Sequence, residues 1–235
     1  MSFGIDANTR STNTVPFKVT KEHWYNLAAL ESVSCDSTEI KSGKQQGQTI
    51  KTLNFKFVAI NPVTGAIDVA QHNEKFFPVD PTGAKAKEQQ QYLNQKIKHL
   101  YEAYAPFPST GLGFGATDWD SFFQKLADDF NVPTGTGDTA TTAPIYKTTD
   151  GKLIPVYLYL TYRTGTGSSN GLLQIPLPNF IEKALKTTDG KAWAMPKLIT
   201  VGRNDVVVRP EKGATGSPTN QPVADREDLP PGFGG

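Results

Sequence analysis

The residues best suited to chemistry lie in one apolar run, which extends from Leu153 to Arg163. Side chains alternate between the two faces of a β-strand, so this run predicts a strand with two unlike faces. One face is aliphatic and suits a core, with Ile154, Val156, Leu158 and Leu160. The other face is aromatic, hydroxylated and basic, with Tyr157, Tyr159, Thr161 and Arg163.

An aromatic and basic strand face is typical of proteins that bind single-stranded nucleic acid, because bases stack on rings and phosphates attract cations. Stacking contributes about 1–3 kcal/mol per base. We expect the stacking residues to be Tyr157, Tyr159, Tyr162 and Trp193, and the phosphate contacts to be Lys51, Lys56, Lys147, Lys152, Arg163 and Lys191. The alternative is that Tyr157 and Tyr159 pack under a second apolar layer, such as a helix expected near residues 85–104.

Enzyme signatures are mostly missing from the sequence. Metal sites need converging ligands, and the histidines are scattered at His23, His72 and His99. Paired aspartates suit a divalent metal in a nuclease, although acids at the start of a helix also stabilise its dipole; the candidates are Asp118, Asp120, Asp128 and Asp129. We therefore expect no catalytic residue, no metal and no cofactor, and we keep the nuclease as a distant alternative.

Composition bounds the class of protein. The chain has 235 residues, a formal net charge of +1 and one cysteine, Cys35. Residues 211–235 carry four acids and two basic residues, so the tail has a net charge of −2 and the body +3. A lone cysteine favours a reducing compartment. The start of the chain lacks the pattern of a signal peptide, and the longest apolar stretch is too short for a membrane helix. We expect a soluble, cytoplasmic protein that does not contact a membrane.

Hydrophobic periodicity predicts the elements of the first half. Residues 20–32 predict a short helix with Thr20 as its cap, and residues 52–59 predict a strand. A turn over residues 61–65 leads to strands near 66–70 and 74–79. The main helix is expected over residues 81–104, and a second helix begins at Thr117 or Asp118.

Turn signals organise the second half. Lys147-Thr-Thr-Asp-Gly-Lys152 recurs as Lys186-Thr-Thr-Asp-Gly-Lys191, and Asp-Gly indicates a hairpin turn in each copy. Strands are expected over residues 153–163, 171–177 and within 193–208, with a short helix over 179–185. The order of strands, helices and strands predicts an α+β fold with an antiparallel sheet or small barrel. We expect a flexible arm (residues 1–16), a globular domain (17–209) and a disordered, mildly acidic tail (210–235).

The chain resembles phage-encoded single-stranded DNA-binding proteins with an oligonucleotide-binding (OB) fold. The resemblance rests on the strand region 147–163, the segment 172–182, the inserted helices and the tail, which ends Asp225-Arg-Glu-Asp-Leu-Pro-Pro-Gly-Phe-Gly-Gly235. It implies an antiparallel OB-like β-barrel with inserted helices. It also implies that the tail recruits replication proteins through Asp225, Glu227, Asp228, Leu229 and Phe233. The order of acids, an aliphatic residue with proline, and Phe resembles the tails of bacterial and phage single-stranded DNA-binding proteins, of which the bacterial ones end in Phe. This tail departs from that pattern, because Arg226 interrupts the acids and two glycines follow Phe233. An unconstrained surface tail is the alternative.

These observations lead to one expected function and one rival. We expect sequence-independent binding of single-stranded DNA in phage replication or recombination, through stacking and phosphate neutralisation and without catalysis. Binding of this kind weakens as salt rises, because phosphate contacts release counterions. The rival is a virion or scaffold protein, which the Thr/Gly-rich loops and the β-rich pattern suit equally well.

Overall fold

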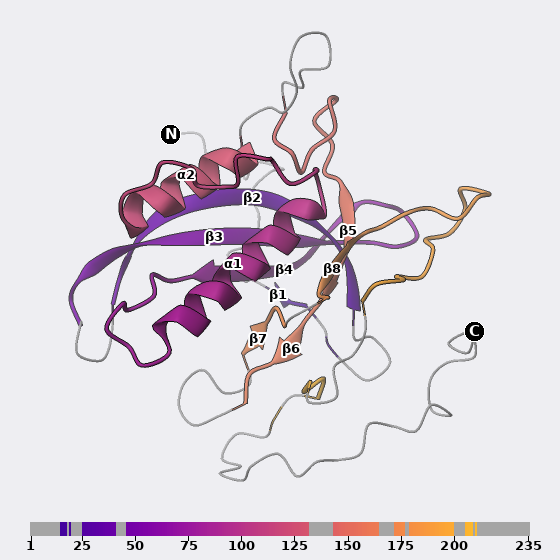
Figure 1. Ribbon diagram of the computed structural model, residues 1–235. Coiled ribbons are helices and arrows are strands. Elements are labelled where there is room, and N and C mark those ends of the chain that lie inside the picture. Colours follow the sequence, from indigo (N-terminus) through magenta and orange to yellow (C-terminus); the bar gives the residue numbers. More distant parts are fainter. Residues whose placement is uncertain are drawn as a thin grey trace, which may run out of the picture.

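The structure is a computed structural model, which describes residues 15–17, 19, 25–40, 46–131, 143–164, 172–176, 179–199, 205–208 and 210. Its centre is a six-stranded sheet, and two helices cover one face of that sheet (Figure 1). The α+β class expected from the sequence is confirmed. The predicted arm ends in β1 (Val15–Pro16), which joins the sheet, and residues 1–14 lie outside the described residues.

The long strand β2 (Tyr25–Glu39) replaces the helix that we expected over residues 20–32. It pairs antiparallel with β3 (Thr49–Ile60) on one side and with β5 (Pro155–Tyr159) on the other. A register shift between Leu30 and Ser32 inserts an extra residue. This bulge spaces the inward apolar residues unevenly, which imitates a helical period. Pairing on both sides outweighs the local helix propensity.

The strand β3 has the alternation that the sequence predicted. Leu53, Phe55 and Phe57 are all fully buried on the face that the helices cover. The chain then turns at residues 61–65, where Gly65 has a φ of 72° and its amide donates to the Asn61 carbonyl at 2.8 Å. The returning strand β4 (Ile67–Phe76) is continuous, so the two short strands expected near 66–70 and 74–79 are one.

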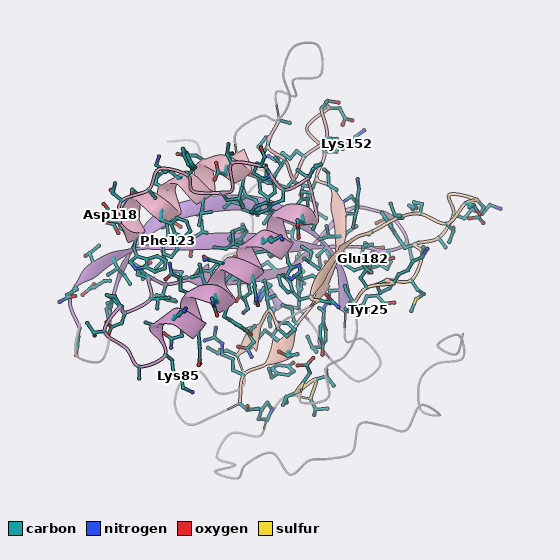
Figure 2. All side chains as sticks on the ribbon, viewed as in Figure 1. Tyr25, Lys85, Asp118, Phe123, Lys152 and Glu182 are labelled. Carbon is teal, nitrogen blue, oxygen red and sulfur yellow. The ribbon has the colours of Figure 1, made fainter. Side chains whose placement is uncertain are left out.

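Both helices predicted after β4 are confirmed. The first, α1 (Ala86–Glu102), buries an apolar stripe of Leu93, Ile97, Leu100 and Tyr101. The second, α2 (Trp119–Asn131), is capped as expected, because the Asp118 Oδ1 accepts the Ser121 amide at 2.7 Å. In Figure 2, Asp118 lies at the beginning of α2, and Phe123 points from this helix toward the sheet.

The sheet continues beyond β5 with β8 (Ile181–Lys183), which pairs antiparallel with β5. The short helix expected over residues 179–185 is therefore wrong, because this segment completes the sheet edge instead. A separate two-stranded sheet consists of β6 (Thr161–Tyr162) and β7 (Leu173–Gln174). Within residues 193–199 and 205–208 the structure contains an isolated bridge between Trp193 and Lys186 but none of the last strands that we expected.

The strand order of the main sheet is β1-β4-β3-β2-β5-β8, and β1 joins β4 in parallel while the other neighbours are antiparallel. Within this sheet, β5-β2-β3-β4 has the spatial order of a Greek key, because the fourth strand returns beside the first. The end strands β1 and β8 do not pair with each other in the described part of the chain, so the sheet is open. The closed barrel that we expected is therefore wrong.

The main core lies between the sheet and the two helices, and aromatic rings dominate its centre. The Phe130 ring of α2 packs edge-on against Phe55 of β3 at 5.0 Å and against Tyr101 of α1 at 5.2 Å. One side chain thus joins three elements. Close packing also requires a glycine at position 113, because its φ is 66° and a Cβ there would lie 2.5 Å from the Phe122 ring.

Candidate nucleic-acid interface

The aromatic face that we expected on the 153–163 strand is not exposed. Tyr157 is 4% exposed and Tyr159 is 1% exposed, because β5 lies inside the sheet with both of its faces covered. The Tyr157 hydroxyl donates to the Ala194 carbonyl, and burial raises the pKa of Tyr157 to about 12. The Tyr159 hydroxyl donates to Asp205 at 2.8 Å. In this structure, both tyrosines have the packing role that was the alternative interpretation.

The other residues that we expected around these tyrosines differ in exposure and in their contacts. Tyr162 is half-buried, and its amide donates to the Val206 carbonyl at 2.8 Å. Arg163 is exposed at the end of β6. Lys147 lies over the Tyr146 ring at 5.8 Å. These residues therefore have different neighbours in the structure.

Three further lysines of the predicted set are also separated. Lys51 and Lys56 are five positions apart on β3, so their side chains point to opposite faces of the sheet. Lys56 forms an ion pair with Glu31 at 2.6 Å. Lys152 forms an ion pair with Asp150 at 2.6 Å, at the tip of the hairpin that projects in Figure 2. That ion pair occupies the exposed ammonium of Lys152.

Basic charge is concentrated instead on residues 181–199, which we call the lysine arm. This segment starts with β8, turns at Gly190 with a φ of 70°, and returns alongside itself through the Lys186–Trp193 bridge. In Figure 1 its turn extends away from the sheet. Four exposed lysines are spread along it, and none forms an ion pair with a carboxylate of a described residue; they are Lys183, Lys186, Lys191 and Lys197.

The two acids of the lysine arm bind its own backbone and leave its ammonium groups free of carboxylates. The Glu182 carboxylate accepts the amide of Lys197 at 2.9 Å and that of Leu198 at 2.7 Å. Asp189 accepts the Lys191 amide at 3.1 Å and the Thr187 hydroxyl. Four lysines against these two acids give the lysine arm a net charge of +2.

Hydrogen bonds to the sheet hold the lysine arm in place. Besides the bond from Tyr157 to Ala194, the Tyr25 hydroxyl of β2 donates to the Met195 sulfur at 3.1 Å. The Trp193 indole nitrogen donates to the Pro62 carbonyl at 3.1 Å, in the turn between β3 and β4. Lys186 lies over the same indole ring at 4.4 Å. Together with the pairing of β8 and β5, these contacts hold the beginning of the lysine arm and residues 193–195 against the sheet.

A second surface is the sheet face opposite the two helices, and we call its polar part the open face. Strand register places on it the side chains of Ser34, Asp36, Thr38, Thr52, Asn54, Lys56, Asn73 and Lys75. They form a hydrogen-bonded network in which Asn54 donates to Asp36 at 2.7 Å and Lys75 donates to Thr38 at 3.4 Å. Neither α1 nor α2 covers this network.

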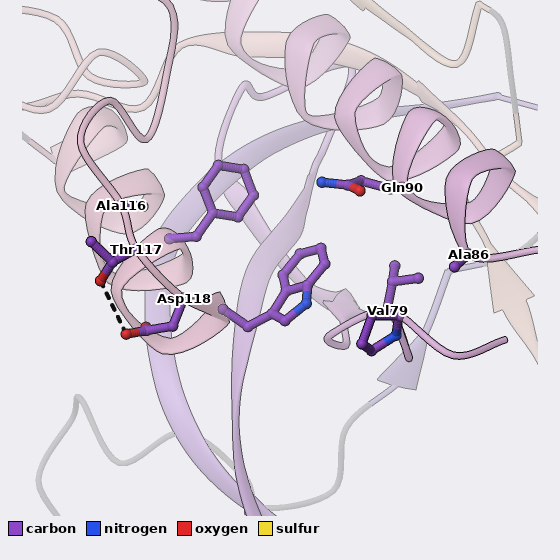
Figure 3. Close-up of a pocket in the computed structure, with 9 residues that line it drawn as sticks. Val79, Ala86, Gln90, Ala116, Thr117 and Asp118 are labelled. Carbon is purple, nitrogen blue, oxygen red and sulfur yellow. Dashed lines mark hydrogen bonds between the residues drawn. The ribbon is translucent and has the colours of Figure 1, made fainter.

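A pocket lies between the beginnings of α1 and α2, with a volume of about 390 Å³ (Figure 3). Its lining is polar and apolar in about equal parts and includes Val79, Gln90 and Trp119. Asp118 reaches its rim, but hydrogen bonds from Ser121 lower the pKa of this carboxyl and engage it as a helix cap. Among the described residues, no three His, Cys, Asp or Glu side chains come together in a way that could hold a metal ion.

Sequence reasoning missed a buried charged cluster between β4 and α1. Glu74 is 4% exposed, and its carboxylate meets His72 at 3.1 Å, Lys96 at 3.6 Å and the Ile175 amide at 3.2 Å. Burial alone would raise the pKa of Glu74, but these three partners outweigh it and hold the pKa below its ordinary value. The signal in the sequence was that His72 and Glu74 share the inward face of β4 with Phe76, at every second position.

The fold and surface define an α+β protein with an open Greek-key sheet and a projecting basic arm. The chain matches no protein-family model, no curated protein and no solved structure. No helix of the described residues has the length and apolar character needed to span a membrane. The tail positions singled out above, from Asp225 to Phe233, lie outside the described residues.

Proposed function

We propose that the protein binds single-stranded DNA without sequence specificity and that the lysine arm supplies the phosphate contacts. The observation that carries this proposal is the set of four exposed lysines within residues 183–197 that have no carboxylate partner among the described residues. Cations that are exposed, unpaired and held on a fixed backbone suit a polyanion, because each phosphate contact releases condensed counterions.

The Greek-key order β5-β2-β3-β4 supports the same proposal. OB folds are partly open Greek-key barrels, and they bind oligonucleotides on the face of their second and third strands and in the adjoining loops. The corresponding strands here are β3 and β4, whose outward side chains belong to the open face. The loop that would correspond to the first OB loop lies between β2 and β3 and carries Lys41 and Lys44 in its sequence.

The tail recruits replication proteins through its acids, Leu229 and Phe233, and the protein works in the cytoplasm, where the free thiol of Cys35 stays reduced. Deletion of residues 211–235 then leaves oligonucleotide binding in place and abolishes capture of such partners. Loss of oligonucleotide binding on deletion would contradict this division of roles.

The decisive experiment is a titration of fluorescent 30-base oligo-dT at several salt concentrations, with the matched duplex as control. Lys191→Gln combined with Lys197→Gln is expected to make the negative slope of log K against log salt less steep by about 1.4, since each single-strand phosphate contact contributes about −0.7. The matched control is Lys85→Gln combined with Lys87→Gln, because both lysines are exposed near the start of α1. Its slope should equal that of the wild type. If the wild type does not bind the single strand at low salt, the proposed function is wrong.

A structural subunit of a larger assembly is the second candidate. The favouring observation is a set of exposed aliphatic side chains around the β3–β4 turn, where Val63 is 89%, Ile67 50% and Val69 70% exposed. Among the described strands β1 pairs with β4 only at Ala70 and Gln71, so the start of β4 has an open edge that favours pairing with another chain. Sedimentation velocity without DNA separates the two candidates, because a defined large oligomer would favour the structural subunit and a small species would favour the DNA-binding protein.

A further inference from the structure

Four large aromatic side chains among the described residues are exposed, and their surroundings differ. Lys96 lies over the Tyr92 ring at 4.9 Å, and Lys98 lies over the Phe107 ring at 5.4 Å. Phe114 is in the glycine-rich connector, where its carbonyl accepts the Lys125 ammonium of α2. The fourth, Phe77, directly follows β4 and is 50% exposed.

The core fixes the direction in which Phe77 points. The preceding residue, Phe76, is buried, and its ring packs edge-on against Phe55 at 5.6 Å on the face that the helices cover. Because side chains alternate along a strand, Phe77 continues the opposite row of β4, which contains Asn73 and Lys75. An exposed ring and an ammonium group therefore lie together at one end of the open face.

The lysine arm adjoins the other end of the same strands. The bond from Trp193 to Pro62 places the lysine arm against the turn between β3 and β4, whereas Phe77 follows the last residue of β4. The ten residues of β4 span about 33 Å at the usual strand rise. A single strand of 4–16 nucleotides, which is the usual range of site sizes for one OB fold, covers a path of this order.

We infer that Phe77 is a base-stacking residue and that Lys75 is a phosphate contact at the far end of a single-strand path that begins on the lysine arm. This inference rests on the proposed function and specifies its footprint. It also replaces Tyr157 and Tyr159, whose rings are buried, with an aromatic ring that a base can reach. The ligand class is an unpaired nucleobase with its 3′ or 5′ phosphate.

Photocrosslinking tests the position of Phe77 directly. An oligo-dT with 5-iodouracil substitutions reacts on irradiation with aromatic side chains that stack on the modified base, and mass spectrometry identifies the attached peptide. We expect a crosslink at Phe77 in the wild type and in Phe77→Tyr, which keeps the ring, and none in Phe77→Ala. Phe77→Ala should also bind oligo-dT about five- to a hundredfold more weakly, because stacking on one base is lost.

The matched control is Phe114→Ala, which removes a ring that is 77% exposed on the helix side of the molecule. Its affinity and crosslinks should equal those of the wild type, and thermal unfolding of each variant shows that the fold is intact. Tight binding by the wild type with unchanged affinity in Phe77→Ala overturns the inference and leaves the proposed function standing. Absence of any binding by the wild type overturns both. A crosslink at Phe114 in place of Phe77 moves the path to the helix side and also overturns the inference.

Discussion

Replacing Glu74 with alanine is expected to destabilise the fold by about 3–5 kcal/mol, which is the usual cost of removing one partner of a buried ion pair. The substitution leaves the Lys96 ammonium, which is 5% exposed, without its carboxylate. It also leaves the Ile175 amide without its acceptor, which loosens the contact between β4 and the β6–β7 pair. Urea unfolding monitored by circular dichroism measures the loss.

An exposed ion pair on α1, the helix that carries Lys96, provides the control for Glu74. Glu102 of α1 meets Lys98 at 3.7 Å, and both side chains are well exposed to solvent. Glu102→Ala should therefore change the free energy of unfolding by less than about 1 kcal/mol. If the two variants lose the same small amount of stability, Glu74 is not the electrostatic link between these elements.

The low pKa of Glu74 gives this prediction a pH dependence. Glu74 is charged in the folded protein at neutral pH, because its pKa is lower there than in the unfolded chain. A glutamate in the unfolded chain titrates at about 4.3. The contribution of Glu74 is therefore fully present above that unfolded value and is lost as pH falls through the folded pKa. The stability difference between the wild type and Glu74→Gln should shrink as pH falls below the unfolded value and through the folded pKa.

Replacing Phe130 with alanine is expected to cost a similar amount, about 3–5 kcal/mol, because the cavity cannot collapse easily. Phe130 is fully buried, and its ring contacts one aromatic partner on the sheet and another on α1. The loss should appear as a lower denaturant midpoint with an unchanged slope. Phe114→Ala serves as the control, since an exposed ring contributes within about 0.5 kcal/mol. Equal midpoints in both variants would contradict the assignment of Phe130 to the centre of the core.

Sequence reasoning predicted the elements whose pattern is regular and local. The stripe of α1, the capped α2, the alternation in β3 and the two Asp-Gly turns each depend on neighbours within a few residues. The strands β2 and β8 were missed because their conformation depends on partners far along the chain. In β2, the bulge after Leu30 also disrupts the period of two that would have indicated a strand.

The candidate site was less predictable than the fold, for a related reason. A period of two separates the faces of a strand but does not tell how many of those faces are covered. Tyr157 looked exposed because its row continues into Thr161 and Arg163, whereas the lysine arm and the Tyr25 ring cover that face of β5. Of the ten residues expected to bind, Lys191 and Trp193 lie on the lysine arm. The other lysines of that segment were passed over because it was divided among an expected helix over residues 179–185, a turn and a strand, so Lys183, Lys186 and Lys197 fell in different predicted elements.

The two copies of the repeated hexapeptide form different turns, so the sequence of the hexapeptide does not by itself determine its conformation. In the first copy the Thr148 amide donates to the Lys152 carbonyl, whereas in the second the Thr187 amide donates to Ala192, one residue further along. The first turn folds its last lysine onto Asp150, and in the second the Asp189 carboxylate accepts the Lys191 amide. Identical turn chemistry thus yields one exposed lysine that is paired with a carboxylate and one that forms no ion pair with a described residue. Amine-reactive reagents should therefore modify Lys191 faster than Lys152. Because the two turns have the same sequence, this difference in reactivity would come from the residues that flank each turn.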